Sequence, residues 1–127
     1  MGDRITKIDV PVGATDIVIF VHGFGVRYDS RGMFTDIKQS LPKNFGSIMF
    51  DFNKVSGKDV YLSSIKEQVG ILREIIENSK TDFPDKKLNV VAHSMGCIIT
   101  SLAGPNIDGK VIFLAPPDNF GDDRLES

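Results

Sequence analysis

The stretch Val90-Val91-Ala92-His93-Ser94-Met95-Gly96 decides how this chain folds. An apolar run typical of a strand ends at Ala92 and a helical pattern begins at Met95, so a serine stands in the turn between them. The small residues two positions before and after it, Ala92 and Gly96, leave room for the strand and the helix to approach each other. The pattern predicts a strand–turn–helix elbow, with the hydroxyl of Ser94 projecting beside the N-terminal N–H groups of the helix.

Apolar runs of strand length recur along the chain and alternate with helical patterns. The runs lie at 17–21, 48–50, 88–92 and 111–115. The helical patterns lie at about 33–41, 59–76 and 95–103. This alternation favours a parallel sheet with right-handed crossovers and helices on both faces. We therefore expect an α/β fold, a three-layer αβα arrangement with a mostly parallel sheet of about five strands, in which Ile5–Val12 supplies a half-exposed edge strand.

The second helical pattern has two notable details. Its apolar stripe runs from Tyr61 to Ile76, and Asp59 is the expected N-cap. Gly70 lies inside the stripe, where a glycine costs about 1 kcal/mol relative to alanine. Either a close packing contact requires this glycine, or the helix is weak at that point.

The composition is that of one ordinary globular domain. Of the 127 residues, 41% are hydrophobic and 25% charged, and we expect a core over 1–115 followed by a polar loop or tail at 116–127. The net charge of −2, with scattered basic residues, argues against nucleic acid as a partner. No apolar run approaches the ~20 residues that span a bilayer, so no membrane partner is expected. Cys97 is the only cysteine, which favours a reducing, cytoplasmic location.

A glycine-rich turn, His22-Gly23-Phe24-Gly25, follows the first central strand. Ligands of a parallel α/β sheet bind beyond the carboxyl ends of its strands, so this turn and Ser94 should meet at one edge. The glycines would let an N–H group, most simply that of Phe24, face the same point as the N–H of Met95. The turn lacks the spacing of a phosphate-binding loop. Together, the two motifs would bring backbone N–H donors from two sides toward one serine.

The stretches 19–25 and 91–96 resemble the bacterial α/β-hydrolase superfamily of small serine esterases and related hydrolases. The resemblance extends from the first strand to the strand that ends at Ala115, so it implies a partial α/β-hydrolase fold. Two positions depart from the family pattern. Ala92 stands where the first glycine is usual, and Cys97 stands where a further small residue is common. Neither departure removes a group that the chemistry needs.

The resemblance implies a role for each residue of the two motifs. Ser94 would be the nucleophile, and the N–H groups of Phe24 and Met95 would form the oxyanion hole. Four further residues are assigned to the binding site: His22, Gly23, Gly25 and Asp51. The substrate would be a small-molecule ester, thioester or amide, and neither a cofactor nor a metal is expected. The apolar side chains of Phe24, Phe52 and Met95 suggest a hydrophobic acyl group, although core packing explains them equally well.

The general base that such a serine needs is not evident. In this family the acid and the histidine usually follow the nucleophile, whereas both histidines here, His22 and His93, precede it. His93 is most simply a packed histidine with one hydrogen bond, and His22 a structural residue of its turn, a substitute base being the less favoured reading. Asp118 occupies a position that some lipases of the superfamily use for the acid, but a solvated turn explains it more simply. Cys97 is more simply a core residue than a rival nucleophile.

Two explanations fit the missing base. Either the chain is a truncated hydrolase that lacks the later strands, or it is a non-catalytic binding or assembly module. The polar ending after Ala115 favours truncation. Truncation would leave 111–114 as an apolar edge strand, which invites pairing with another chain, so a homo-oligomer is expected. The favoured hypothesis is a serine hydrolase of the esterase type, acting through an acyl-enzyme on Ser94 and weak or inactive in this chain.

Overall fold

The computed structural model describes residues 6–23, 26–56, 59–61 and 63–115. The strands of this part are β1 (Thr6–Asp9), β2 (Asp16–Val21), β3 (Phe45–Phe50), β4 (Lys54–Ser56), β5 (Asp59–Tyr61), β6 (Lys87–His93) and β7 (Val111–Leu114). The helices are α1 (Met33–Ser40), α2 (Ile65–Asp82) and α3 (Met95–Ala103). None of these helices is long and apolar enough to cross a membrane.

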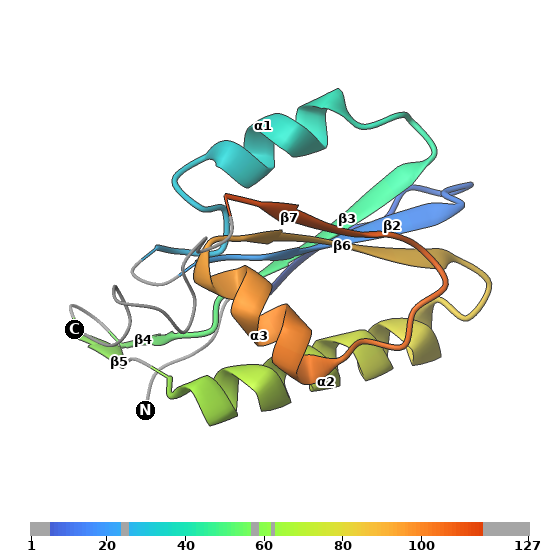
Figure 1. The fold of residues 1–127 in the computed structure, drawn as a ribbon. Helices are drawn as coiled ribbons and strands as arrows, with labels where there is room; N and C mark the ends of the chain where they lie inside the picture. The colour runs from blue at the N-terminus through green and yellow to red at the C-terminus, as the bar shows by residue number, and fades with distance from the viewer. Residues whose placement is uncertain (1–5, 24–25, 57–58, 62, 116–127) are drawn as a thin grey trace.

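Five strands form one sheet in the order β1-β3-β2-β6-β7. β1 runs antiparallel to β3, and all other neighbouring pairs are parallel. Helix α1 covers one face of the sheet, while α2 and α3 cover the other (Figure 1). The predicted three-layer αβα fold with a mostly parallel sheet of five strands is therefore confirmed. The carboxyl ends of β2, β3 and β6 meet at one edge of the sheet.

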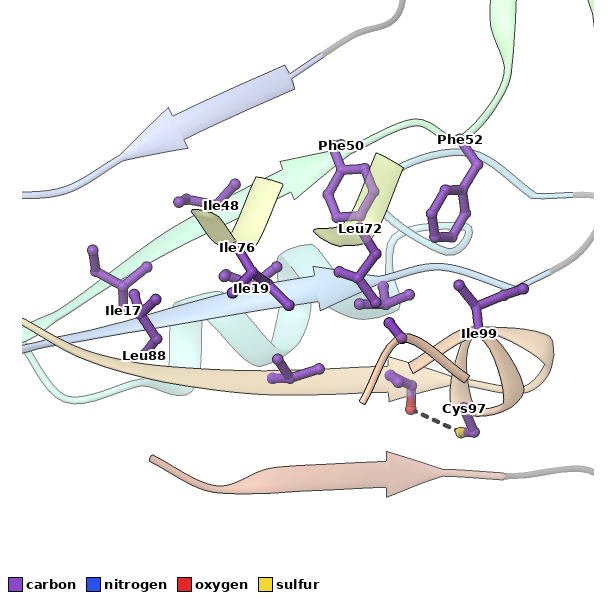
Figure 2. Close-up of a cluster of buried hydrophobic side chains, with 14 residues drawn as sticks. Ile17, Ile19, Ile48, Phe50, Phe52, Leu72, Ile76, Leu88, Cys97 and Ile99 are labelled. Atoms are coloured by element: carbon purple, nitrogen blue, oxygen red, sulfur yellow. Dashed lines mark hydrogen bonds between the residues drawn. The ribbon is translucent and has the colours of Figure 1, made fainter. Parts of the chain in front are cut away.

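Two cores lie on the two faces of the sheet, and β2 contributes to both. Ile17, Ile19 and Val21 join the core beneath α2 and α3 (Figure 2). Val18 and Phe20 join the smaller core beneath α1. Because every second residue faces the opposite side of a strand, burial on both faces requires a continuous apolar run. That requirement explains the unbroken run in this part of the sequence.

Helix α2 begins later than the sequence pattern predicted. Its N-cap is Ser64 rather than Asp59: the N–H of Glu67 donates to Ser64 Oγ at 3.1 Å, and the N–H of Ser64 donates to Glu67 Oε1 at 2.9 Å. Asp59 instead begins β5, which pairs antiparallel with β4 in a hairpin that the sequence analysis missed. The apolar stripe alone extends too far toward the N-terminus. The Ser–Glu spacing of a capping box marks the true start.

Gly70, inside α2, has no packing contact that would require a glycine. A Cβ atom built at this position has nothing within 4 Å. Of the two explanations that the sequence allowed, the close contact is therefore wrong. The glycine lowers the helix propensity of α2 without a compensating contact at that position.

The two edge strands of the sheet differ in character. β1 is exposed along its whole length, more than the half-exposed strand that was expected, and Ile8 retains 56% of its accessible surface. In β7, Val111, Ile112 and Phe113 retain 43%, 48% and 41%. Within the described residues, β7 pairs with β6 alone. It is the apolar edge strand that the sequence predicted.

Candidate active site

Ser94 lies between β6 and α3 with a backbone conformation that few residues other than glycine adopt. Its φ is 54° and its ψ is −121°, and such strained positions cost about 1–3 kcal/mol. The turn is held from two sides, because the N–H of Ser94 donates to the carbonyl of Leu114 at 3.0 Å and its carbonyl accepts from the N–H of Cys97 at 2.9 Å. The side chain makes no hydrogen bond that caps α3. The ordinary capping role of a serine therefore does not account for this residue.

Gly96 allows α3 to approach the end of β2 closely. A Cβ atom at this position would lie 2.4 Å from the carbonyl oxygen of Val21 and 2.8 Å from that of His22. Both are backbone atoms of the neighbouring strand end and cannot swing aside. Met95 begins the helix, and the first N–H groups of a helix have no acceptor within the helix itself. The backbone at the tip of the elbow can therefore donate hydrogen bonds to a ligand.

Gly23, in the turn after β2, lies directly against the serine. A Cβ atom on Gly23 would lie 3.1 Å from Ser94 Cβ and 3.2 Å from the carbonyl oxygen of His93. The fold thus brings the two sequence motifs together at one edge of the sheet. Three of the predicted site residues lie outside the described part of the chain: Phe24, Gly25 and Asp118.

His22 is buried, with 2% of its surface exposed, and both of its ring nitrogens contact the backbone. Nε2 accepts a hydrogen bond from the N–H of Phe52 at 2.9 Å, so Nδ1 carries the proton that it shares with the carbonyl of Gly23 at 2.7 Å. Burial lowers the pKa of His22 below its ordinary value, and the ring is neutral at pH 7. This geometry suits a residue that joins the ends of β2 and β3. It leaves no nitrogen to accept a proton from Ser94.

Asp51, which directly follows β3, is committed to an ion pair. Nη2 of Arg27 lies 2.8 Å from Asp51 Oδ2, and Nε donates to the two carboxylate oxygens at 3.2 and 3.1 Å. The carboxylate side chain is 1% exposed, while the arginine side chain is 42% exposed. The hydrogen bonds to Asp51 raise the pKa of Arg27 above its ordinary value. Asp51 therefore holds the loop between β2 and α1, and both of its carboxylate oxygens accept hydrogen bonds from Arg27.

His93, the residue before the serine, contacts Phe34 of α1 and Ser30 of the loop before that helix. Its ring meets Phe34 edge-on, with 6.5 Å between ring centroids. Its Nδ1 lies 3.3 Å from Ser30 Oγ. The contact fits the packed histidine with one hydrogen bond that the sequence favoured.

Cys97 is a core residue, as the sequence predicted. Its side chain belongs to the larger core, and its Sγ donates to the carbonyl of Ala92 at 3.4 Å (Figure 2). Burial raises the pKa of the thiol, which disfavours the reactive thiolate. Across the described ranges, no three His, Cys, Asp or Glu side chains are grouped so that they could hold a metal ion.

Two residues of the loop between β2 and α1, Arg27 and Ser30, contact the site although the sequence did not predict them. In sequence this loop resembles a solvated turn, because it is rich in Asp, Ser and Gly. One signal was available for the arginine. An aspartate that directly follows a buried strand is rarely buried without a cationic partner, so Asp51 called for one. No comparable signal marks Ser30.

Comparison with protein families gives one match that covers most of the chain. The family described as "Alpha/beta hydrolase of unknown function (DUF900)" matches residues 8–107. No curated protein matches the sequence well enough to count as a relative.

Solved structures with the same fold include several hydrolases. An α/β serine hydrolase homologue from Coxiella burnetii shares 16% identity at a TM-score of 0.75, over 94% of this chain and 61% of that one. The lidless α/β serine hydrolase XC6422 from Xanthomonas campestris shares 18% identity at a TM-score of 0.69, over 94% and 58%. A monoacylglycerol lipase from Paleococcus ferrophilus shares 23% identity at a TM-score of 0.58, over 91% and 43%. The chain thus spans about three fifths of the length of the first two structures.

Proposed function

The chain belongs to the family of alpha/beta hydrolases of unknown function, and from this premise we propose that Ser94 is the nucleophile of a serine hydrolase. One observation carries the proposal. Ser94 is held at φ 54° at the tip of the β6–α3 turn, and its side chain does not cap the helix. A strained backbone at a residue whose side chain has no capping role is typical of a residue that takes part in chemistry. The fold relatives described as serine hydrolases support the same reading.

The proposed reaction is acyl transfer. Ser94 Oγ forms a bond to the acyl carbon of an ester, thioester or amide, the bond to the leaving group breaks, and the leaving group takes up the proton that the serine loses. The first N–H groups of α3, beginning with Met95, would stabilise the negative charge on the acyl oxygen, together with an N–H of the turn after Gly23. The chain then supplies the nucleophile and an electrostatic site for the intermediate.

Neither histidine of this chain is placed to act as the general base for Ser94. His22 is neutral, with both ring nitrogens on backbone partners, and His93 contacts Ser30. No other histidine occurs in the 127 residues. We therefore expect residues 1–127 to turn over substrate weakly or not at all, and the base to come from outside them. A serine without its base still gains from the oxyanion site, so slow acylation is expected.

A fluorophosphonate probe tests the proposal, because it phosphonylates activated serines. We expect slow labelling that disappears in Ser94→Ala. Ser101→Ala is the matched control, since Ser101 lies on the same helix and its Oγ donates to the carbonyl of Cys97 at 2.9 Å. Labelling should persist in that control and in Cys97→Ala. If neither this chain nor a longer form of the protein is labelled at Ser94, the proposal fails.

The proposal includes the chemical class of the substrate and the cellular location of the protein. A small-molecule ester, thioester or amide fits the proposed chemistry, and the lipase among the fold relatives is compatible with an apolar acyl group. Phe52 does not line a pocket for that group, because it is 1% exposed and packs against His22 and Phe50. The free, buried thiol of Cys97 is compatible with a cytoplasmic location.

The exposed edge of β7 favours a second candidate function, assembly with a second copy of the chain. Its exposed side chains are apolar, and an unpaired strand edge readily adds another strand. The same edge on a second copy is complementary about a two-fold axis. Light scattering should show a dimer that Ile112→Lys converts to a monomer, while Ile8→Lys on the opposite edge changes nothing. A monomeric chain at high concentration would contradict this candidate.

A further inference from the structure

Two side-chain contacts fix the loop 26–32 at the carboxyl ends of β3 and β6. Arg27 contacts Asp51, and Ser30 contacts His93; we call these two contacts the brace. We propose that the brace positions the start of this loop against Ser94, so that Arg27 and Ser30 are positioning residues for the reaction. The inference rests on the proposed function of Ser94. It concerns residues that would touch neither the substrate nor the reacting atoms.

The first contact attaches the loop to the end of β3. Arg27 offers Nε and Nη2 to both oxygens of Asp51, a paired geometry that a lysine cannot reproduce. Since the carboxylate is 1% exposed, moving the arginine away would leave a buried charge without its partner. That loss is strongly unfavourable. The position of the Arg27 side chain is therefore fixed by Asp51, while its backbone carbonyl accepts a hydrogen bond from the N–H of Ser30 at 2.9 Å.

The second contact attaches the loop to the end of β6, at the residue that precedes the nucleophile. Ser30 is 5% exposed and Oγ lies 3.3 Å from His93 Nδ1. Ser30, Arg31 and Gly32 have successive φ values of 49°, 59° and 90°. A run of left-handed residues is unfavourable by itself and persists only where its surroundings impose it. The contact with His93 is one such constraint.

The brace and Gly23 both lie close to the nucleophile turn. Gly23 lies so close to Ser94 and His93 that a Cβ atom on it would be 3.1 Å from Ser94 Cβ and 3.2 Å from the His93 carbonyl oxygen. Arg27 follows Gly23 by only four positions, a span of roughly 14 Å at full extension. The contacts of Arg27 with Asp51 and of Ser30 with His93 therefore attach the loop 26–32 to the ends of β3 and β6, beside Gly23 and Ser94. Oxyanion stabilisation depends on donors placed to within about 0.5 Å. A shift of Gly23 or His93 relative to Ser94 would therefore slow acylation.

The test measures the fluorophosphonate labelling rate of Ser94 as a function of probe concentration, which separates the maximal rate from probe binding. For Arg27→Gln we expect the maximal rate to fall by about tenfold or more, with binding little changed. Arg27→Lys should recover part of the rate, and Ser30→Ala should show a smaller loss. Arg31→Gln, an exposed position of the same loop, is the matched control and should label like the wild type.

Arg27→Gln leaves a buried carboxylate, so a second variant guards against simple misfolding. Arg27→Gln combined with Asp51→Asn removes both charges and keeps polar groups of similar size. We expect this double variant to melt close to the wild type and still to label slowly. If it labels at the wild-type rate, the brace has no positioning role and the inference is overturned.

Backbone hydrogen exchange keeps the inference testable if the wild type is not labelled at all. In that case the proposed function fails, and the brace is judged by the protection of residues 22–32 and 92–97. Faster exchange confined to these segments in Arg27→Gln/Asp51→Asn, with α2 unchanged, supports the brace. Unchanged exchange at both segments contradicts it.

Discussion

The two helices on one face of the sheet begin in opposite ways. The N-cap residue of α2 is Ser64, whose φ of −70° is ordinary and whose side chain accepts a capping hydrogen bond. The corresponding residue before α3 is Ser94, whose φ of 54° is strained and whose side chain makes no capping hydrogen bond. Their glycines differ as well: Gly70 has open space around it, whereas a Cβ on Gly96 would lie 2.4 Å from the Val21 carbonyl oxygen.

This difference separates local from tertiary causes of structure. The start of α2 follows from the residues around it, so its stability comes from local hydrogen bonds and from an amphipathic face. The start of α3 opposes local preference and is imposed by contacts with the neighbouring strands. Strain of this kind persists only where the surrounding structure imposes it, and it is found most often at functional sites. The strained residue before α3 is also the candidate nucleophile.

The largest expected effect is that of Gly96→Ala. The added methyl group would overlap the backbone oxygens of Val21 and His22, so α3 must move away from β2. Overpacking of this kind typically costs about 1–3 kcal/mol, and contact with immobile backbone places this variant at the upper end. Urea denaturation would measure the loss. An unchanged free energy of unfolding would show that the helix does not lie so close to the strand.

Next in size is Ser64→Ala, which removes the cap of α2. Loss of an N-cap serine costs about 1 kcal/mol of stability. Ser94→Ala is the comparison, because it removes a serine from the same position of α3 without removing a capping bond. Thermal or urea unfolding of both variants would measure the difference. Equal losses would contradict the contrast between the two helix starts.

The same contrast explains how much of the fold could be predicted from the sequence. The bounds of α3 agree with the helical pattern at 95–103, because the strand pattern and the small-residue spacing around Ser94 mark where the helix begins. The predicted start of α2 was wrong because it followed the apolar stripe and not the capping box at Ser64. The hairpin of β4 and β5 was missed because β5 (Asp59–Tyr61) fell within the segment that was assigned to the helix.

The candidate site was only partly predictable. The proximity of Gly23 and Ser94 follows from the rule that parallel strands end at one edge, and the structure places the two residues together. The links of Arg27 to Asp51 and of Ser30 to His93 join residues far apart in the chain. No local pattern encodes such pairings, and only the burial of the aspartate signals one of them.

Ser94→Gly should change stability in the direction opposite to an ordinary substitution. Glycine adopts a φ of 54° with little strain, so the variant releases part of the 1–3 kcal/mol stored in the turn. Greater freedom of the unfolded chain offsets some of that gain, and the net increase should be about 1 kcal/mol or slightly less. Ser101→Gly, inside α3, is the control and should instead lose about 1 kcal/mol. A loss in Ser94→Gly would mean that the turn is not strained.

The smallest expected effect is that of Gly70→Ala, the counterpart of Gly96→Ala in the other helix. A methyl group at position 70 meets no atom within 4 Å, and alanine restricts the unfolded chain and favours the helix. The free energy of unfolding should therefore rise by about 0.5–1 kcal/mol, a gain that urea denaturation can resolve. The same mutation would then stabilise one helix and destabilise the other. If Gly70→Ala lowered the stability, position 70 would be making a close contact, and the glycines of the two helices would be alike.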